Sequence, residues 1–352
     1  MKNKNILIIL AFTILYLNCD LSISNRDKIS SSGKLVFATS DSTVGPPGIY
    51  TMNLDGSNLQ PVAVVGDIYH SGHLDNDYVI RFPPSFPSWS SDGKMIVCQL
   101  TTAFEMDKIL LMNSDGSNKR TLPVMWSANN PRWSPEGDKI LFIKSQYLGE
   151  NFAVSIVDSS GQNVWDIPEV AYKWGEPQVF QGDTIWSRGP SSDFQWGCEN
   201  DRVYARASVN AKPEMIYILG SNPHNEIVSY DVETGNIIER LTYNDFDEAG
   251  FRISPYGKMV AFIRTKESSS SNLYLLKLET GEHSIIELKG SIHPTMFNWS
   301  TDGSKIVFAK DEDPNSYRSR YHIYMVDVSN QNNEVRLTTF PASCPDLFIQ
   351  NN

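Results

Sequence analysis

Short apolar runs alternate with polar turn sequences along most of the chain, and one such pattern returns several times. In PSWSSDGKMIVC, which begins at Pro87, an apolar segment ends at Trp89 and the sequence SSDG forms a tight-turn signal. An Ile-, Val- and Met-rich run follows at 94–100, a second apolar run spans 109–112, and SDGS at 114–117 signals another turn. The pattern predicts four short antiparallel strands joined by tight turns.

The same unit recurs along the chain. Convincing copies begin at Pro131 (PRWSPEGDKILF), Phe251 (FRISPYGKMVAF) and Phe297 (FNWSTDGSKIVF), and weaker copies begin at Ser31 (SSGKLVF) and Phe194 (FQWGCENDRVYA). The aligned copies share one turn position, occupied by Gly33, Gly93, Gly137, Asn200, Gly257 and Gly303. Each interval fits four strands and a variable loop. The chain is therefore predicted to be an all-β, six-bladed β-propeller, with seven blades as the alternative.

The first copy lacks the strand that precedes the turn, and the end of the chain supplies a match for it. Pro345 and the apolar residues after it correspond to Pro87-Ser88-Trp89. We expect the segment 341–352 to complete the first blade and close the ring, because closure removes strand edges that would otherwise be exposed.

The motif W-S-x-D-G-x-x-I-x-F, followed by a strand and a D-G-S turn, resembles the repeat of TolB-type propellers, a WD40-like repeat also called PD40. The resemblance covers nearly all of the chain after about residue 31 and implies a propeller domain over 33–352. Propellers of one repeat family carry unrelated activities, so the motif is specific for fold and not for mechanism. TolB binds envelope proteins, and the resemblance implies a partner of that kind.

The amino terminus has the pattern of a secretory leader. Lys2 and Lys4 precede an apolar run over 6–17 that is shorter than the roughly 20 residues a membrane-spanning helix needs. The sequence LYLNC ending at Cys19 resembles a lipobox, although its Tyr and Asn depart from the usual residues. We expect a signal peptide over 1–19, lipidation of Cys19 and a flexible tether over 20–32. A plain secreted protein and an uncleaved anchor remain the alternatives.

Composition and charge narrow the classes of partner. The 352 residues include 30 basic and 41 acidic side chains, a formal net charge of −11. An acidic protein lacks the basic surface that nucleic acids demand. The expected protein is therefore a monomer of the bacterial cell envelope, tethered to a membrane by its lipid and facing the periplasm or the exterior, with no nucleic-acid partner.

The long connections are expected to share one rim of the ring. Those over 63–86 and 167–192 join successive blades, and those over 206–224 and 311–320 join the second and third strands of a blade. Their aromatic and Arg side chains have the composition of interface cores, although the tryptophans could simply pack a long loop onto the ring. The candidate binding residues are Tyr69, His70, His73, Arg81, Trp174, Trp186, His224, Tyr317, Arg318 and Arg320.

The leading hypothesis is a non-enzymatic scaffold that binds an envelope protein, a peptide or a glycan on this surface. The alternative is a polysaccharide lyase or hydrolase whose axial pocket holds His70, His73, His224 and Arg81, with the histidines as weak metal candidates. A purely structural envelope protein is the third. The sequence has no GxSxG elbow and no phosphate-binding Gly-rich loop, so we expect no catalytic residues, no metal and no cofactor.

Two further patterns have simple explanations. Asp55, Asp115 and Asp302 each precede a Gly in a turn sequence, and turn chemistry explains them better than calcium binding. After the leader, the three cysteines are Cys98, Cys198 and Cys344, an odd number with no CxxC spacing. They are interpreted as small buried side chains, with a single disulfide bridge left open.

Overall fold

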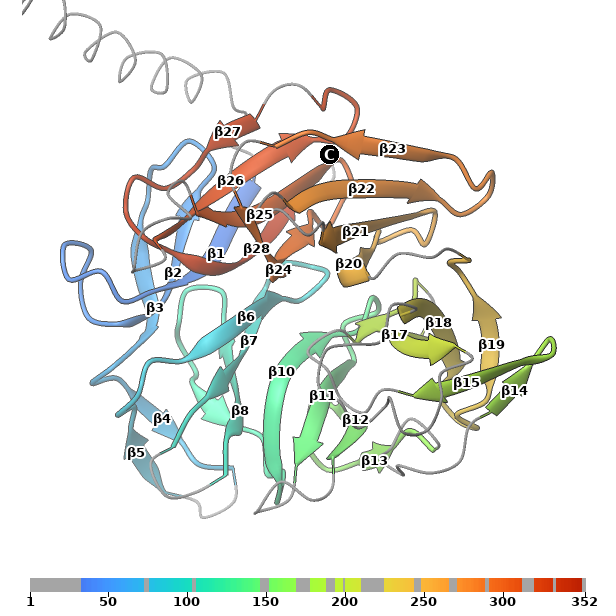
Figure 1. Cartoon of the computed structure of the whole chain (residues 1–352). Coiled ribbons are helices and arrows are strands. Elements are labelled where there is room, and N and C mark those ends of the chain that lie inside the picture. Colours follow the sequence, from blue (N-terminus) through green and yellow to red (C-terminus); the bar gives the residue numbers. More distant parts are fainter. Residues whose placement is uncertain are drawn as a thin grey trace, which may run out of the picture.

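The computed structural model describes residues 33–72, 76–102, 106–145, 152–168, 178–187, 194–198, 200–209, 225–243, 248–265, 271–288, 291–311, 320–331 and 334–349. These residues form six β-sheets that surround a central axis as the blades of a propeller (Figure 1). No helix within them has the length and apolar character needed to cross a membrane. The prediction of an all-β, six-bladed propeller is confirmed.

The blades share one plan, in which neighbouring strands of a sheet follow one another from the axis to the outer edge. Blade 1 contains β28 (Ser343–Ile349), β1 (Gly33–Thr39), β2 (Gly48–Asn53) and β3 (Gln60–Val64). Blade 2 contains β6 (Ser85–Trp89), β7 (Met95–Leu100), β8 (Lys108–Asn113), β9 (Arg120–Thr121), β4 (Ile68–His70) and β5 (Asp77–Val79). Blade 3 contains β10 (Ser127–Trp133), β11 (Lys139–Ser145), β12 (Phe152–Asp158) and β13 (Val164–Asp166).

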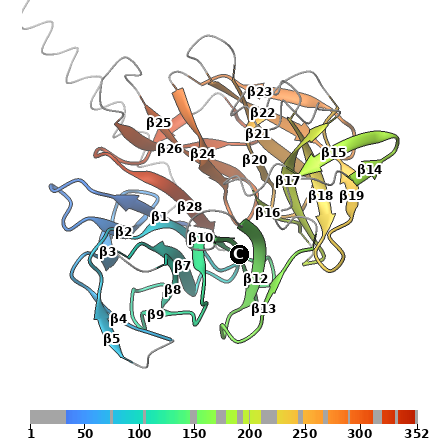
Figure 2. The same ribbon diagram turned by 60° about the horizontal axis from the view of Figure 1, so that its bottom comes forward.

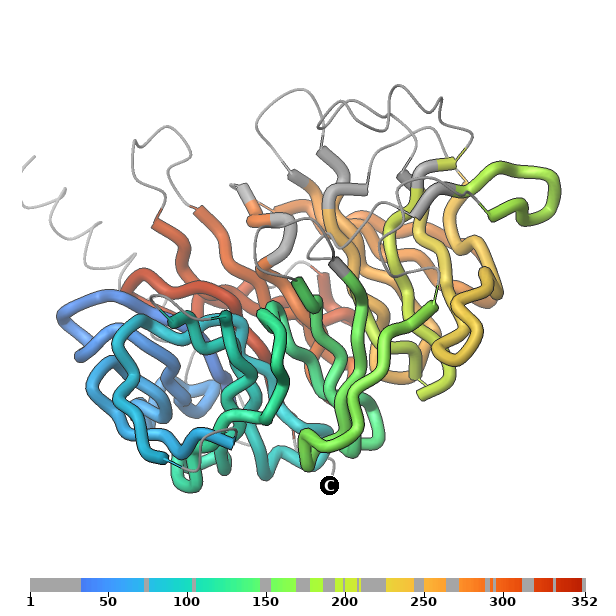
Figure 3. The backbone as a smooth tube through the Cα atoms, turned by 90° about the horizontal axis from the view of Figure 1, so that it is seen from below, coloured from blue at the N-terminus to red at the C-terminus, as the bar shows by residue number. Residues whose placement is uncertain are grey.

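Blade 4 is a single sheet with an inserted hairpin. Its strands are β16 (Gln195–Trp196), β17 (Arg202–Val209), β18 (Asn225–Asp231), β19 (Ile237–Arg240), β14 (Gln178–Phe180) and β15 (Asp183–Ser187). The β14–β15 hairpin stands out from the body of the ring (Figure 3). Apart from β13, which belongs to blade 3, the described strands over 161–242 form one blade and not two, so the ring has six blades.

The remaining blades follow the four-stranded plan. Blade 5 contains β20 (Glu248–Ile253), β21 (Met259–Thr265), β22 (Ser271–Lys277) and β23 (His283–Ile286). Blade 6 contains β24 (Ser291–Trp299), β25 (Lys305–Asp311), β26 (Tyr321–Asp327) and β27 (Glu334–Arg336).

The repeated W-S-x-D-G sequence forms a hydrogen-bonded clamp between the first two strands of a blade. In blade 2, the Ser90 hydroxyl donates to Asp92 at 2.7 Å and accepts the Met95 N–H at 3.0 Å. Gly93 follows with a φ of +67°, a backbone conformation that suits glycine. The corresponding serine of blades 3, 5 and 6 accepts the equivalent N–H. We call the rim that carries these turns, at 91–94, 135–138, 255–258 and 301–304, the short-turn rim, and the opposite one the loop rim.

The hydrophobic core is divided among the six interfaces between blades. Each of six buried clusters draws residues from two neighbouring sheets, including one that joins blade 6 to blade 1. Successive residues of a strand face opposite neighbours, so both faces are buried and the strands read as nearly continuous apolar runs. The tryptophans of the repeat belong to this core: Trp89, Trp133, Trp196 and Trp299.

The C-terminal strand closes the ring. β28 pairs antiparallel with β1, and Figure 2 shows the two strands side by side. One carboxylate oxygen of the buried Asp346 accepts the Trp89 N–H at 2.7 Å, and the other accepts the Asn298 amide at 2.7 Å. Thr301 also exchanges hydrogen bonds with the main chain of Ile349. β28 is therefore tied to blades 1, 2 and 6, and the predicted closure is confirmed.

An unpredicted irregularity repeats in three inner strands. Phe86, Asn130 and Cys344 have φ angles of 51°, 51° and 49°, and each precedes a proline. The pairing with the second strand shifts register at the same place in all three blades. These are β-bulges, which bend a strand and redirect the side chains that follow.

Candidate functional site

The insertion over 63–86 builds an extra hairpin on the outer edge of blade 2. β4 and β5 pair antiparallel with Tyr69 opposite Tyr78, and β4 adds to the blade through a parallel pairing of His70 with Arg120. The hairpin covers the outermost strand, so this part of the insertion lies beside the blade and not on the loop rim, which corrects the prediction. The reason is that burial of Tyr69 and pairing with β9 hold the hairpin against the blade.

A cavity of about 440 Å³ lies where this hairpin meets the connection between β7 and β8. It is walled by Tyr69, Asp77, Tyr78, Val79, Ile80, Arg81, Phe82, Leu100, Thr101 and Thr102. Two of the predicted binding residues, Tyr69 and Arg81, are among them. The walls combine aromatic and aliphatic surface with one cation, one carboxylate and the hydroxyls of two threonines and two tyrosines, a composition that suits a binding pocket.

The two faces of the hairpin differ in character. On the inner face, the Tyr69 and Tyr78 rings stack at 5.9 Å with an interplanar angle of 25°, and Tyr69 is only 6% exposed. On the outer face, Ile68 and Val79 stand opposite each other and are 63% and 52% exposed. Cross-strand pairs of this kind stabilise a hairpin, but two large apolar side chains left in water are a feature of contact surfaces.

The two described residues of the predicted axial pocket, His70 and Arg81, do not lie at the axis. His70 and Arg81 lie with the outermost strands of blade 2, on the side away from the axis. His70 Nδ1 is 3.2 Å from Asp77 Oδ1 in an exposed pair. His73 and His224 lie outside the described residues. Among those described, no group of three or more His, Cys, Asp or Glu side chains is placed to hold a metal ion.

A second cavity of about 330 Å³ lies between blades 1, 2 and 6. Its walls come from the end of β1, the starts of β6, β26 and β28, and the residues beside them: Ala38, Thr39, Ser40, Pro83, Pro84, Ser85, Tyr321, Pro341, Ala342 and Ser343. These strand ends belong to the loop rim near the axis. The Thr39 hydroxyl donates to the Pro341 carbonyl at 2.7 Å, which ties one wall to the C-terminal segment.

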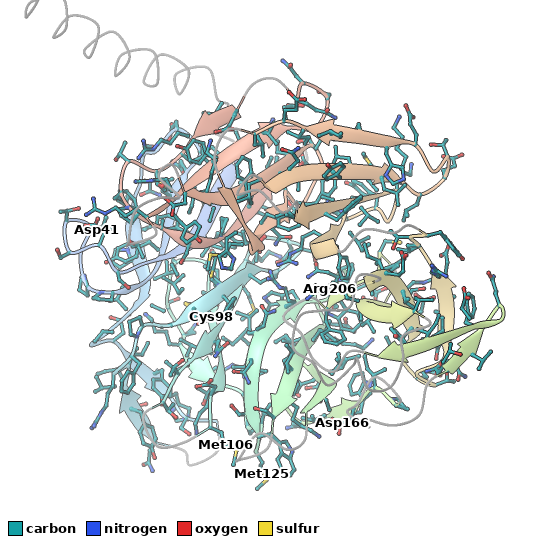
Figure 4. All side chains as sticks on the ribbon, in the orientation of Figure 1. Asp41, Cys98, Met106, Met125, Asp166 and Arg206 are labelled. Atoms are coloured by element: carbon teal, nitrogen blue, oxygen red, sulfur yellow. The ribbon has the colours of Figure 1, made fainter. Side chains whose placement is uncertain are left out.

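The structure describes only two of the remaining predicted residues, Arg320 and Trp186. Arg320 is exposed beside blade 1, where hydrogen bonds from Thr43, and to a smaller extent the charge of Arg320, lower the pKa of Asp41. Asp41 lies at the outer margin of that blade (Figure 4). Trp186 is on β15, which pairs with β17. Cys19, Trp174, Tyr317 and Arg318 lie outside the described residues. Most of the insertions over 206–224 and 311–320 do so as well.

Sequence reasoning missed three aromatic residues that line the cavities. Tyr78 and Phe82 are in the insertion that was singled out, and their signal was the same aromatic content that pointed to Tyr69. Tyr321 directly follows the connection over 311–320 and became a strand residue, so position alone did not mark it.

The three described cysteines form no disulfide bridge, and the aspartates of the turn sequences accept hydrogen bonds within their own turns. Cys98, Cys198 and Cys344 are all free thiols, so no bridge joins them. Only Cys98 is fully buried, within blade 2 (Figure 4), and burial raises the pKa of its thiol. Cys198 is exposed, which corrects its interpretation as a buried side chain. Asp55 accepts the hydroxyl and N–H of Ser57, and Asp115 and Asp302 accept equivalent turn hydrogen bonds.

The chain was compared with known proteins. No protein-family model matches it. Over 243 residues it is 24% identical to the Tol-Pal system protein TolB of Francisella tularensis subsp. mediasiatica, in an alignment that covers 62% of this chain and 54% of that protein. The chain thus spans about half the length of the curated relatives it matches.

Two solved structures support the same relationship. TolB from Acinetobacter baumannii superimposes with a TM-score of 0.60 at 16% identity, covering 90% of this chain and 67% of that one. The putative TolB from Agrobacterium tumefaciens gives 0.51 at 14% identity, covering 90% and 92%. At these identities the similarity establishes the fold: a distant, TolB-like six-bladed propeller.

Proposed function

We propose that this chain is a non-enzymatic recognition scaffold of the bacterial cell envelope, which binds a protein, peptide or glycan partner beside blade 2. The observation that carries the proposal is the 440 Å³ cavity under an inserted hairpin that four-stranded blades do not need. Arg81 and Phe82 are exposed at its wall, and Arg and aromatic side chains dominate the energetics of protein interfaces. The similarity to TolB, a Tol-Pal system protein, supports an envelope location and a protein partner.

An axial polysaccharide lyase is a weaker candidate. Its site would need the four predicted side chains to converge at the axis, whereas His70 and Arg81 lie at the outer edge of blade 2. General acid–base or metal chemistry depends on groups held within hydrogen-bond reach of one substrate. The placement of these two residues removes that geometry.

The proposed lipid anchor sets the orientation of the scaffold. Gly33 pairs with Ile349 at the end of β28, so the chain enters the propeller on the short-turn rim. The 14 residues from Cys19 to Gly33 span at most about 50 Å when extended. An anchored protein would then hold its loop rim away from the membrane. The mass of the mature protein tests the anchor, and an unmodified Cys19 would contradict it.

A pull-down from native bacterial envelopes tests the recognition function. We expect the double variant Arg81→Glu, Phe82→Ala to lose at least tenfold of the co-purified partner, because it reverses one charge and removes one apolar contact. The matched control is Lys258→Glu, Tyr256→Ala, which makes the same changes at exposed residues on the short-turn rim. Equal recovery of partner by the two variants would contradict the proposed site.

A further inference from the structure

One stretch of backbone lines both cavities in succession. Residues 77–82 wall the first cavity, and residues 83–85 wall the second. Nine residues of extended chain reach about 30 Å. The two cavities are therefore neighbours along a single path, which leads from the outer edge of blade 2 to the loop rim near the axis. A ligand that fills both would be long and narrow.

The outer part of this path has an open strand edge. Among the strands that the structure describes, β5 is the last of its sheet. Ser71 donates its N–H to the Asn76 carbonyl and Ile80 donates to Asp67, so the even-numbered residues of this strand use their main-chain groups within the hairpin. Because the pattern alternates, the main-chain groups of Asp77 and Val79 face outward. Such an edge can pair with another extended chain.

The side chains along the path are mainly apolar, with one exposed cation. Val79 and Phe82 are 52% and 39% exposed, and Ile68 stands beside Val79. Arg81 lies between Val79 and Phe82 in the sequence and is exposed at the wall of the first cavity, where its guanidinium is suited to a carboxylate. We propose, on the basis of the recognition function above, that the partner binds as an extended peptide segment along 77–85. It pairs with β5, places one apolar side chain in each cavity and sets an acidic side chain beside Arg81.

The geometry favours a peptide over a glycan. Sugar rings stack on open aromatic faces, whereas Tyr69 and Tyr78 each have one face covered by the other at 5.9 Å, which leaves Phe82 as the exposed aromatic side chain among the described wall residues of this cavity. The unpaired edge of β5 offers N–H and C=O groups at the spacing of another strand, and a glycan chain does not match that spacing. The apolar side chains add contact area that a hydrated sugar would not use.

Selection from a library of random linear dodecapeptides displayed on phage tests this inference on the full chain. We expect enriched sequences in which two apolar residues flank an aspartate or glutamate. A fluorescein-labelled selected peptide should bind Arg81→Glu at least tenfold more weakly by fluorescence anisotropy, and reselection on that variant should favour Lys or Arg at the middle position. Peptides cut to half length should bind at least tenfold more weakly, because they reach only one cavity.

Two variants at Val79 test the strand pairing. Val79→Pro removes the outward N–H but no hydrogen bond of the hairpin, so we expect at least a tenfold loss of peptide affinity with an unchanged unfolding temperature. Val79→Thr keeps the N–H and the β-branched shape and should bind as the wild type does. If Val79→Pro lowers the unfolding temperature, the charge reversal at Arg81 remains the decisive variant.

No enrichment, or equal affinity for the wild type and Arg81→Glu, would overturn the inference. Enrichment of glycans on an array in place of peptides would also overturn it. If the recovery of the native partner in the pull-down still depends on Arg81 and Phe82, the recognition function is retained even though the peptide inference is wrong. If the recovery of the partner does not depend on these two residues, both the recognition function and the peptide inference are contradicted.

Discussion

At the scale of single residues, aspartates stabilise the turns of the propeller through hydrogen bonds that require the ionised carboxylate. Asp327 shows the balance of effects in blade 6. Burial alone would raise its pKa, but hydrogen bonds from Ser329 and Lys305 outweigh burial and lower the pKa to about 2. Lys305 Nζ lies 3.0 Å from the carboxylate. The turn is therefore held by a charge that persists into strong acid.

The lowered pKa of Asp327 predicts a pH-dependent contribution to stability. A carboxyl whose pKa is lower in the folded state stabilises the fold above its unfolded pKa of about 3.8, and this stabilisation disappears as the pH falls toward 2. We expect Asp327→Asn to lower the free energy of unfolding by about 1 kcal/mol at pH 7, since partial exposure screens the pair.

Urea denaturation at several pH values measures this contribution. The difference between the wild type and Asp327→Asn should shrink between pH 4 and pH 2. Glu233→Gln, in the corresponding turn of blade 4, is the control and should change little. A difference that stays constant down to pH 2 would contradict the assignment.

At the scale of elements, the turn between the first two strands of blade 2 also packs against the C-terminal strand β28. Gly93 has a φ of +67°, and a Cβ added there would lie 2.5 Å from the Phe348 ring of the C-terminal strand. The turn of blade 2 and the closing strand are thus in direct contact. Gly182, in the β14–β15 hairpin, has a φ of +92° with nothing within 4 Å of the added atom.

These two glycines separate backbone strain from steric conflict. Gly182→Ala should cost about 1–2 kcal/mol, the price of a left-handed conformation for an L residue. Gly93→Ala should cost at least about 2 kcal/mol more, because the Phe348 ring must also move. Chemical denaturation measures both. Equal losses would show that the turn of blade 2 does not press on the closing strand.

The same elements show what the sequence could and could not predict. The turn glycines and the repeat motif followed from local patterns, because each depends on residues within one unit. The closing strand followed from a comparison of the copies, because the first copy lacks a strand that the end of the chain supplies. The hairpin position did not, since it depends on a parallel pairing of His70 with Arg120, fifty residues away. The bulges at Phe86 and Asn130 leave no mark in the apolar pattern. The second cavity joins residues near 39, 84 and 342, which only the closed ring brings together.

At the scale of the whole molecule, six interfaces share the core and one strand completes the circle. The cluster between blades 6 and 1 includes Leu347 of β28, so removal of that strand opens an interface and exposes the inner edge of β1. The same segment supplies Pro341, Ala342 and Ser343 to the second cavity. Ring closure and the proposed peptide path therefore depend on the same residues.

Deletion of residues 341–352 is the most direct test of this account. We predict that the truncated chain loses the single cooperative unfolding transition of the wild type, followed by circular dichroism during heating, and binds none of the selected peptides. Loss of closure should destabilise all six blades together, because each is held mainly by its neighbours. A truncated chain that unfolds cooperatively at the wild-type temperature and retains peptide binding would contradict it.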